Sequence, residues 1–300
     1  MITILGPTAT GKTNLAAHLA HLINGEIISA DSRQVYRGMD IGTGKDLADY
    51  SIEGKIIPYH LVDIVEPGYE YNVFEFQKDF LNAYSAIDER GSIPILCGGT
   101  GLYIESVLKG YKLINVPKNE LLREELELKS EAELIEILET LKNLHNTTDT
   151  SERERLIRAI EIQKYYDNNP AIDTFFPKIE TKIFGIDYDR RVVRMRITER
   201  LEERLKNGMI EEVQGLLNSG VKPEQLTFYG LEYKWVTDYL EGNLAYNEMF
   251  RRLNTAIHQF SKRQMTWFRR MEKQGFVINW IDGNLSLNEK VAYILKNLGS

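Results

Sequence analysis

Eight residues near the start of the chain have the types and the spacing of a phosphate-binding loop. They read Gly6, Pro7, Thr8, Ala9, Thr10, Gly11, Lys12 and Thr13, which fits the pattern G-x-x-x-x-G-K-[ST]. An apolar run at 1–5 predicts a strand before the loop, and the apolar spacing of 14–22 predicts a helix after it. In that setting backbone N–H groups and the helix N-terminus bind an anion, Lys12 adds a positive charge, and the Thr13 hydroxyl can reach Mg²⁺. The loop predicts a phosphate or pyrophosphate site; the alternative is a glycine-rich turn that binds nothing.

Two more polar segments follow predicted strands. Residues 25–31 have an apolar strand pattern that ends in Asp31, and the apolar run 93–97 is followed at once by the glycine-rich segment 98–101, which contains Thr100. In a parallel sheet, ligands bind beyond the carboxyl ends of the strands, so Asp31, Thr100 and the phosphate-binding loop should line one crevice. Three roles compete for Asp31: it can hold Mg²⁺ through water, act as a general base, or cap the next turn.

Arginine pairs at helical spacing add candidate phosphate contacts. Arg200 and Arg204 are four residues apart, and Arg155 and Arg158 are three apart. Each pair lies on one face of its predicted helix, where it can clamp phosphates or form salt bridges with nearby glutamates.

The composition excludes several classes of protein. The chain has 300 residues and a net charge of −7, yet 189–206 and 251–273 are strongly basic, which predicts two local basic surfaces or solvated helix faces. No apolar run approaches the ~20 residues of a membrane span. The chain begins with its first predicted strand, so no signal or transit peptide is expected. Cys97 is the only cysteine, which excludes an internal disulfide and a cysteine-based zinc site and favours the cytoplasm. Cys97 itself is predicted to be a core residue.

Strand and helix patterns alternate along the chain. Nearly continuous apolar strands imply a parallel sheet, so the predicted fold is α/β, a P-loop sheet with helices on both faces. Polar helical patterns at 114–176 predict a small helical insertion, which leaves 1–113 and 177–300 as the catalytic core with its C-terminal helices. The other predicted strands are 59–65, 179–187 and 277–281, and the other predicted helices are 74–87, 190–207, 208–218, 231–241, 245–272 and 286–298.

Six segments together carry a family resemblance. They are 6–13, 31–43, 60–63, 98–103, 155–161 and 262–269. With these segments in this order, the chain resembles the tRNA dimethylallyltransferases, also called tRNA isopentenyltransferases or IPP transferases. The stretches Asp-Ser-x-x-Val-Tyr, from Asp31, and Lys-Arg-Gln-x-Thr-Trp, from Lys262, are far more specific than the phosphate-binding loop alone.

The resemblance implies a reaction. A dimethylallyl group would move from dimethylallyl pyrophosphate to N6 of adenine 37 of tRNA, beside the anticodon, and give N6-isopentenyladenosine. The loop at 6–13 would hold the pyrophosphate, which is the leaving group, and Lys12, Thr13, Mg²⁺ and either Arg200 or Arg204 would stabilise its charge. Asp31 would accept the N6 proton as general base. The adenine would leave its stack to reach the site.

The resemblance also implies contacts with the anticodon loop. The implied tRNA-binding residues are Asp31, Ser32, Arg33, Gln34, Thr100, Arg155, Arg158, Lys262, Arg263, Gln264, Thr266, Trp267 and Arg269. Thr100 is also expected among the catalytic residues. The insertion at 114–176 would face the tRNA as a lid. We expect a cytoplasmic monomer without a membrane partner.

Three other functions compete with this hypothesis. An adenylate isopentenyltransferase would prenylate a free nucleotide, but it needs neither the 262–269 stretch nor the insertion. A small-molecule P-loop kinase would place arginines in a lid over ATP, and the Asp31 stretch is not part of that pattern. An RNA-binding module with a vestigial loop would not require Lys12, Thr13 and Asp31 together. The sequence therefore favours a tRNA-modifying prenyltransferase.

Overall fold

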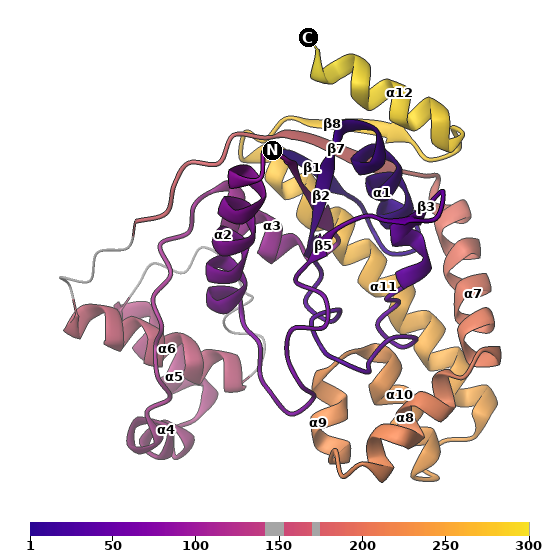
Figure 1. Cartoon of the computed structure of the whole chain (residues 1–300). Helices are drawn as coiled ribbons and strands as arrows, with labels where there is room; N and C mark the ends of the chain where they lie inside the picture. Colours follow the sequence, from indigo (N-terminus) through magenta and orange to yellow (C-terminus); the bar gives the residue numbers. More distant parts are fainter. Residues whose placement is uncertain (142–152, 170–174, 300) are drawn as a thin grey trace. The chain divides into compact units, whose positions relative to one another are not determined.

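The chain divides into two compact units. One unit comprises Met1–Gly110 and Lys178–Ser300, and the other comprises Tyr111–Pro177. The computed structural model describes residues 1–141, 153–169 and 175–299. The sheet lies in the first unit, which we call the larger unit, and the smaller unit is helical (Figure 1).

The larger unit is built on a sheet of six strands. In order across the sheet they are β5 (Tyr59–His60), β2 (Gly25–Ala30), β6 (Ile93–Gly98), β1 (Ile2–Leu5), β7 (Lys182–Asp187) and β8 (Ile278–Asp282). Every neighbouring pair is parallel. The inner strands are buried on both faces, which is why they read as apolar runs rather than as alternating patterns. This sheet confirms the predicted parallel α/β fold.

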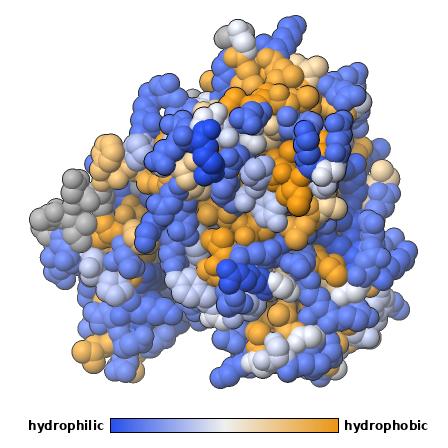
Figure 2. Space-filling model, in the orientation of Figure 1, coloured by the Kyte–Doolittle hydropathy of each residue, from blue (hydrophilic) through white to orange (hydrophobic). Residues whose placement is uncertain are grey.

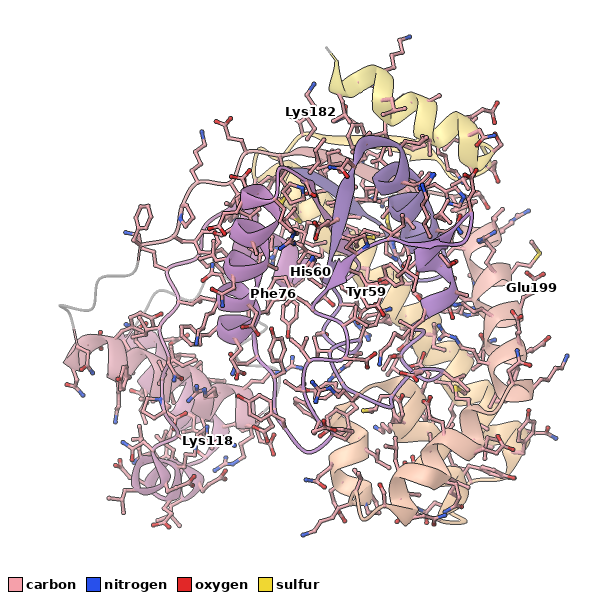
Figure 3. The ribbon with its side chains drawn as sticks, in the orientation of Figure 1. Tyr59, His60, Phe76, Lys118, Lys182 and Glu199 are labelled. Carbon is pink, nitrogen blue, oxygen red and sulfur yellow. The ribbon has the colours of Figure 1, made fainter. Side chains whose placement is uncertain are left out.

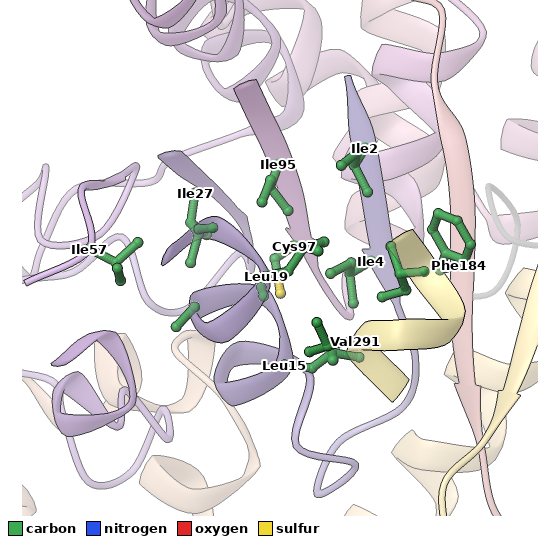
Figure 4. Packing of buried hydrophobic residues seen from close by; sticks show 14 of the residues in the cluster. Ile2, Ile4, Leu15, Leu19, Ile27, Ile57, Ile95, Cys97, Phe184 and Val291 are labelled. Atoms are coloured by element: carbon green, nitrogen blue, oxygen red, sulfur yellow. The ribbon is translucent and has the colours of Figure 1, made fainter. Parts of the chain in front are cut away.

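Helices cover both faces of the sheet, as predicted. They include α1 (Lys12–Ile23), α12 (Leu287–Leu298), α2 (Val73–Glu89) and α3 (Gly101–Leu108). On one face α1 and α12 pack over the sheet around Ile4, Leu15 and Val291 (Figure 4). On the other face α2 and α3 pack against each other and against β6. The loops that follow the strands are therefore anchored by a buried core on both sides.

The C-terminal half of the larger unit is mainly helical. It contains α7 (Arg190–Lys206), α8 (Met209–Asn218), α9 (Pro223–Phe228), α10 (Leu231–Leu240) and α11 (Tyr246–Lys273). The predicted helices here are confirmed to within one residue, but α9, which begins at Pro223 between two of them, was not predicted. Proline suits the first position of a helix, where its missing N–H has no intrahelical partner to lose.

The face of the molecule that Figure 2 displays carries many hydrophilic residues and several patches of apolar ones. Exposed apolar side chains such as Leu22, Ile56 and Val277 lie on different parts of the chain. Among the helices that the structure describes, none combines the length and the apolar character needed to cross a membrane.

The predicted strand at 59–65 is wrong beyond His60. The backbone leaves the extended region at Leu61 and Asp63, where φ is 61° and 55°. The segment then pairs with a neighbouring loop: the N–H of Asp63 donates to the carbonyl of Gln34 at 3.1 Å. Two further elements, the short helix η1 (Leu47–Tyr50) and the hairpin of β3 (Ser51–Ile52) and β4 (Lys55–Ile56), were not predicted. An apolar run alone does not separate a strand from a buried, hydrogen-bonded loop.

The smaller unit has its own core. Its helices are α4 (Glu120–Glu127), α5 (Glu131–Leu141) and α6 (Arg153–Asn168). Their apolar faces meet around Leu126, Leu134, Leu138, Leu156, Ile157 and Ile160. Beside this core Glu161 is buried, and it accepts hydrogen bonds from Arg123, Arg158 and the N–H of Asn119. Although burial opposes ionisation, these donors lower the pKa of Glu161 to about 2.

A single carboxylate fixes the loop at 40–42 in the larger unit. Glu212, on α8, accepts hydrogen bonds from the backbone N–H groups of Asp40, Ile41 and Gly42 at 2.9, 2.7 and 3.0 Å. The Tyr233 hydroxyl donates to the same carboxylate at 2.7 Å. One side chain thus satisfies three consecutive backbone donors, and it holds the loop against the C-terminal helices.

We expect Glu212→Ala to lower the free energy of unfolding by about 3 kcal/mol, because three backbone donors lose their acceptor. Urea unfolding measures this change. The control is Glu211→Ala, an exposed glutamate on the same helix, which should change stability by less than about 0.5 kcal/mol. Equal effects of the two substitutions would contradict the assigned role of Glu212.

Candidate active site

Three loops meet at the carboxyl edge of the sheet. The last residues of β2, β6 and β1 lie in one register row, so Asp31, Gly99 and Gly6, which follow them, leave the sheet side by side. The N–H of Ser32 donates to Thr100 Oγ1 at 3.1 Å and joins two of these loops. Asp31, Thr100 and the phosphate-binding loop thus lie at one edge of the sheet, and that they line one crevice stays a prediction.

The phosphate-binding loop is tightly packed. A Cβ on Gly6 would lie 3.1 Å from a backbone oxygen of β7 and 3.2 Å from Thr10 Oγ1. Gly11 has a φ of 77° where the chain enters α1, in the left-handed region that favours glycine. The Thr10 hydroxyl donates to the carbonyl of Pro7 at 2.8 Å. These contacts give the loop one defined backbone shape at the N-terminus of a helix, as an anion site requires.

Lys12 lies inside the loop. Its ammonium donates to the carbonyl of Pro7 at 2.8 Å. Burial lowers the pKa of Lys12 to about 8, and the positive charge of Arg200 acts in the same direction. An anion bound in the loop would favour the ammonium form. Cys97 is buried nearby, as predicted for a core residue, and burial raises the pKa of its thiol to about 12.

Asp31 caps a turn with one of its carboxylate oxygens. Its Oδ1 accepts a hydrogen bond from the N–H of Arg33 at 2.9 Å, which is the third of the roles considered for this residue. No other described residue hydrogen-bonds to this carboxylate, so the second oxygen can still accept a proton from a ligand. The turn therefore orients the carboxylate without excluding a role as general base.

Residues 33 and 34 have protein partners in the structure. The Arg33 guanidinium lies 5.2 Å from the centre of the Phe228 ring. The Gln34 side chain accepts from Ser29 Oγ at 3.3 Å and donates to the carbonyl of Gly44 at 3.2 Å. Both side chains thus link the loop after β2 to neighbouring segments.

The predicted arginines of α7 face the loop at 44–46. Arg200 Nη2 donates to Asp46 Oδ2 at 2.6 Å, and Arg204 Nη1 lies 3.7 Å from Glu232 Oε1. Arg204 Nη2 is buried and has no hydrogen-bond partner among the described residues. Burial lowers the pKa of Arg204 to about 10, with a further lowering from Arg200. Both acids, Asp46 and Glu232, lie outside α7, whereas Glu199 of this helix is exposed and points away from the sheet (Figure 3).

Arg196 is a site residue that the sequence analysis missed. Its Nε donates to the carbonyl of Ala9, inside the phosphate-binding loop, at 2.8 Å. Arg196 precedes Arg200 and Arg204 by one and two steps of four residues, so all three lie on one helix face. That spacing was present in the sequence and could have identified Arg196.

Helix α11 contacts the same loops from its buried face. Gln264 accepts from the N–H of Thr8 at 2.9 Å and donates to the carbonyl of Gly99 at 2.9 Å. Trp267 packs against Gly101, where a Cβ would lie 2.4 Å from the indole. The other predicted tRNA-binding residues of this helix, Lys262, Arg263, Thr266 and Arg269, are exposed. The structure therefore separates the predicted stretch into a buried and an exposed set.

Arg155 and Arg158 belong to α6 of the smaller unit. Arg155 is exposed. Arg158 pairs with Glu161 and donates to the carbonyl of Val116 at 2.7 Å. The salt-bridge alternative thus describes the observed state of Arg158, and the implied tRNA contacts of both arginines stay predictions.

The loop offers Mg²⁺ few protein ligands. No group of three or more His, Cys, Asp or Glu that could hold a metal ion occurs among the described residues. Mg²⁺ in proteins often keeps several waters and binds through one or two protein oxygens together with substrate phosphates. Thr13, in the first turn of α1, supplies a hydroxyl oxygen of this kind. The residues present therefore fit a Mg²⁺ ion that binds together with a diphosphate.

Fold and loop geometry together define a P-loop α/β protein whose Gly6–Thr13 loop lies at the carboxyl edge of its sheet. A sequence model described as IPP transferase matches residues 34–271, and one described as isopentenyl transferase matches residues 1–54. The chain belongs to the IPP transferase family.

Relatives of this family match the chain over its whole length. A protein of Porphyromonas gingivalis named tRNA dimethylallyltransferase 2 is 58% identical over 100% of this chain and 99% of its own. A Bacteroides fragilis protein of the same name is 57% identical over 99% of this chain and 97% of its own. The crystal structure of a tRNA isopentenylpyrophosphate transferase from Bacillus halodurans has a TM-score of 0.72 and 32% identity, and the match covers 99% of this chain and 95% of that one.

The depressed pKa of Lys12 leads to a spectroscopic prediction. We expect one lysine ¹³Cε resonance to titrate near pH 8, well below the surface lysines, and to be missing in Lys12→Arg. Inorganic pyrophosphate should raise this pKa, because an anion stabilises the ammonium. A Lys12 resonance that titrates with the surface lysines, or that ignores pyrophosphate, would contradict the site as described.

Proposed function

We propose that this chain is a tRNA dimethylallyltransferase that transfers a dimethylallyl group from dimethylallyl pyrophosphate to N6 of adenine 37. The observation that carries the proposal is the shared edge of the sheet. There a phosphate-binding loop, a carboxylate with one unused oxygen and a row of arginines on α7 come from separate parts of the chain. The names of relatives at 57–58% identity support tRNA as the acceptor.

The reaction forms one bond and breaks another. N6 attacks C1 of the dimethylallyl group, the bond from C1 to the pyrophosphate oxygen breaks, and pyrophosphate leaves with the electron pair. Lys12 and the N–H groups of the loop stabilise the charge that develops on this leaving group, with Arg200 or Arg204 as a further cation. Asp31 accepts the N6 proton through its second carboxylate oxygen, while the turn to Arg33 fixes its orientation.

Mg²⁺ is the cofactor that we propose for this site. When bound with the diphosphate, it would neutralise part of the leaving group's charge. Thr13 is the protein residue that would hold it. The donor set supports this proposal, since the loop offers a hydroxyl and the substrate itself offers the remaining anionic oxygens.

The tRNA surface that we propose includes the exposed side of α11, the loop after β2 and the smaller unit, which would act as a lid. RNA loops are recognised through unstacked bases and phosphate contacts, for which exposed Lys and Arg are suited. We propose that the enzyme is a monomer that acts in the cytoplasm, where its tRNA substrate would be found.

A transfer assay tests the function. The protein is incubated with labelled dimethylallyl pyrophosphate, Mg²⁺ and unmodified tRNA, AMP or no acceptor. We expect label in tRNA alone. Label in AMP would instead support an adenylate isopentenyltransferase. Transfer to neither acceptor would reject a prenyltransferase of either kind, and ATP-dependent phosphorylation of a small molecule would point to a kinase.

Asp31→Asn should reduce the transfer rate at least ~10²-fold, the low end for loss of a general base. Asn retains an oxygen that can accept the N–H of Arg33, so the turn should persist, and tRNA affinity should stay within about twofold. Single-turnover kinetics and filter binding measure the two quantities. A near-normal rate would remove Asp31 from the mechanism.

Replacing Lys262 and Arg263 with Gln should weaken tRNA binding. The slope of log K for tRNA against log salt concentration should become shallower by about 0.7 for each contact to a single-stranded phosphate that is lost. The matched control replaces Lys55 and Lys296, exposed lysines on β4 and α12, and makes the same change in net charge. If both double variants bind tRNA alike, the exposed side of α11 is not a tRNA contact.

A further inference from the structure

Gln264 joins two of the loops that make the candidate site. Its carbonyl oxygen accepts the N–H of Thr8 in the phosphate-binding loop, and its amide nitrogen donates to the carbonyl of Gly99 in the loop after β6. Both bonds are 2.9 Å long, and the residue is 7% exposed. Each end of the planar amide therefore has a protein partner, one on each loop.

The surroundings of Gln264 are shaped around this contact. A Cβ on Gly99 would lie 2.4 Å from Gln264 Nε2, so only glycine lets the amide approach this backbone. Further along α11, Arg270 donates to the buried Glu105 of α3 at 2.6 Å. This bond anchors α11 to α3, the helix that follows the loop after β6, and so fixes the position of Gln264 relative to that loop.

Helix α11 has two chemically different sides. Its buried side carries Ser261, Gln264, Phe268 and Met271, which follow helical spacing. Its exposed side carries the cations assigned above to tRNA. The resemblance groups Gln264 with these cations as a tRNA contact, but its side chain lies on the buried side of the helix, between Thr8 and Gly99.

We propose that Gln264 is a positioning residue for the pyrophosphate site. It holds the Thr8 amide and thereby sets the backbone shape in which the phosphate-binding loop receives the prenyl donor. Gln264 belongs to α11, the helix whose exposed side is the tRNA surface in the proposed function. The inference rests on the proposed function for the identity of the donor, but its effect is defined by pyrophosphate binding.

Two substitutions test this role. Gln264→Met removes both hydrogen bonds and keeps a side chain of similar size. Gln264→Glu keeps an oxygen that accepts the N–H of Thr8, but its ionised carboxylate has no donor for the carbonyl of Gly99 and is repelled by that oxygen. We expect the Kd of inorganic pyrophosphate with Mg²⁺, measured by calorimetry without tRNA, to rise about tenfold in Gln264→Met, and by a similar factor in Gln264→Glu at a pH where the introduced carboxyl is ionised, from the loss of one or two hydrogen bonds. The Kd of tRNA should stay within about twofold. Gln259→Met and Gln259→Glu, at an exposed glutamine of the same helix, are the matched controls and should bind pyrophosphate normally.

The pH dependence of Gln264→Glu separates positioning from a general loss of stability. A protonated carboxyl has the same donor and acceptor as an amide, and burial raises the pKa of a carboxyl. The Kd ratio of Gln264→Glu to the wild type should therefore approach one as the pH falls, while Gln264→Met stays weak.

Two outcomes would overturn the inference. One is normal pyrophosphate binding with weakened tRNA binding, which would make Gln264 a tRNA contact. The other is a Kd ratio for Gln264→Glu that does not change with pH. A wild-type protein that binds pyrophosphate but prenylates no tRNA would instead reject the proposed function, and it would leave the role of Gln264 to be decided by the same binding data.

Discussion

The site depends on how the backbone of one loop is held. An anion cradle works only if several N–H groups point inward at the same time, and a short loop has few contacts of its own to enforce that. Besides the Thr10 hydroxyl, which also binds the carbonyl of Pro7, three longer side chains secure it. Lys12 binds the carbonyl of Pro7 from within, Arg196 binds the carbonyl of Ala9 from α7, and Gln264 binds the N–H of Thr8 from α11. The last two come from elements far along the chain, so the loop reaches this shape only when the fold is complete.

The same arrangement concentrates positive charge in an acidic protein. The net charge is −7, yet Lys12, Arg196, Arg200 and Arg204 gather around one end of the sheet. The cost of this crowding appears in the lowered pKa values of Lys12 and Arg204, which burial produces first and the positive charge of Arg200 second. A polyanionic ligand relieves both effects. Crowded positive charges destabilise a site that is empty, and a bound polyanion stabilises it. Such a site favours a leaving group whose negative charge increases as it departs.

Local patterns in the sequence predicted much of the fold. The phosphate-binding loop, the buried strands and the long amphipathic helices follow from short-range spacing, and the shared edge of Asp31, Thr100 and the loop follows from the rules of parallel sheets. Other features depend on tertiary contacts. The strand pattern at 59–65 failed because Leu61 and Asp63 turn toward the loop at 34–35, a pairing that no local signal reveals. Arg196 could have been found from its spacing, whereas the position of Gln264 between two loops follows only from how α11 packs.

The central claim is that the loop holds prenyl pyrophosphate while Asp31 faces the acceptor nitrogen. A crystal structure with a tRNA anticodon stem-loop and an inert thio analogue of dimethylallyl pyrophosphate tests both halves at once. We expect the diphosphate inside the loop at 6–13, with Lys12 bound to it, and the N6 atom of the flipped adenine about 3 Å from an Asp31 oxygen. A diphosphate bound outside this loop, or an adenine whose N6 lies out of reach of Asp31, would contradict it.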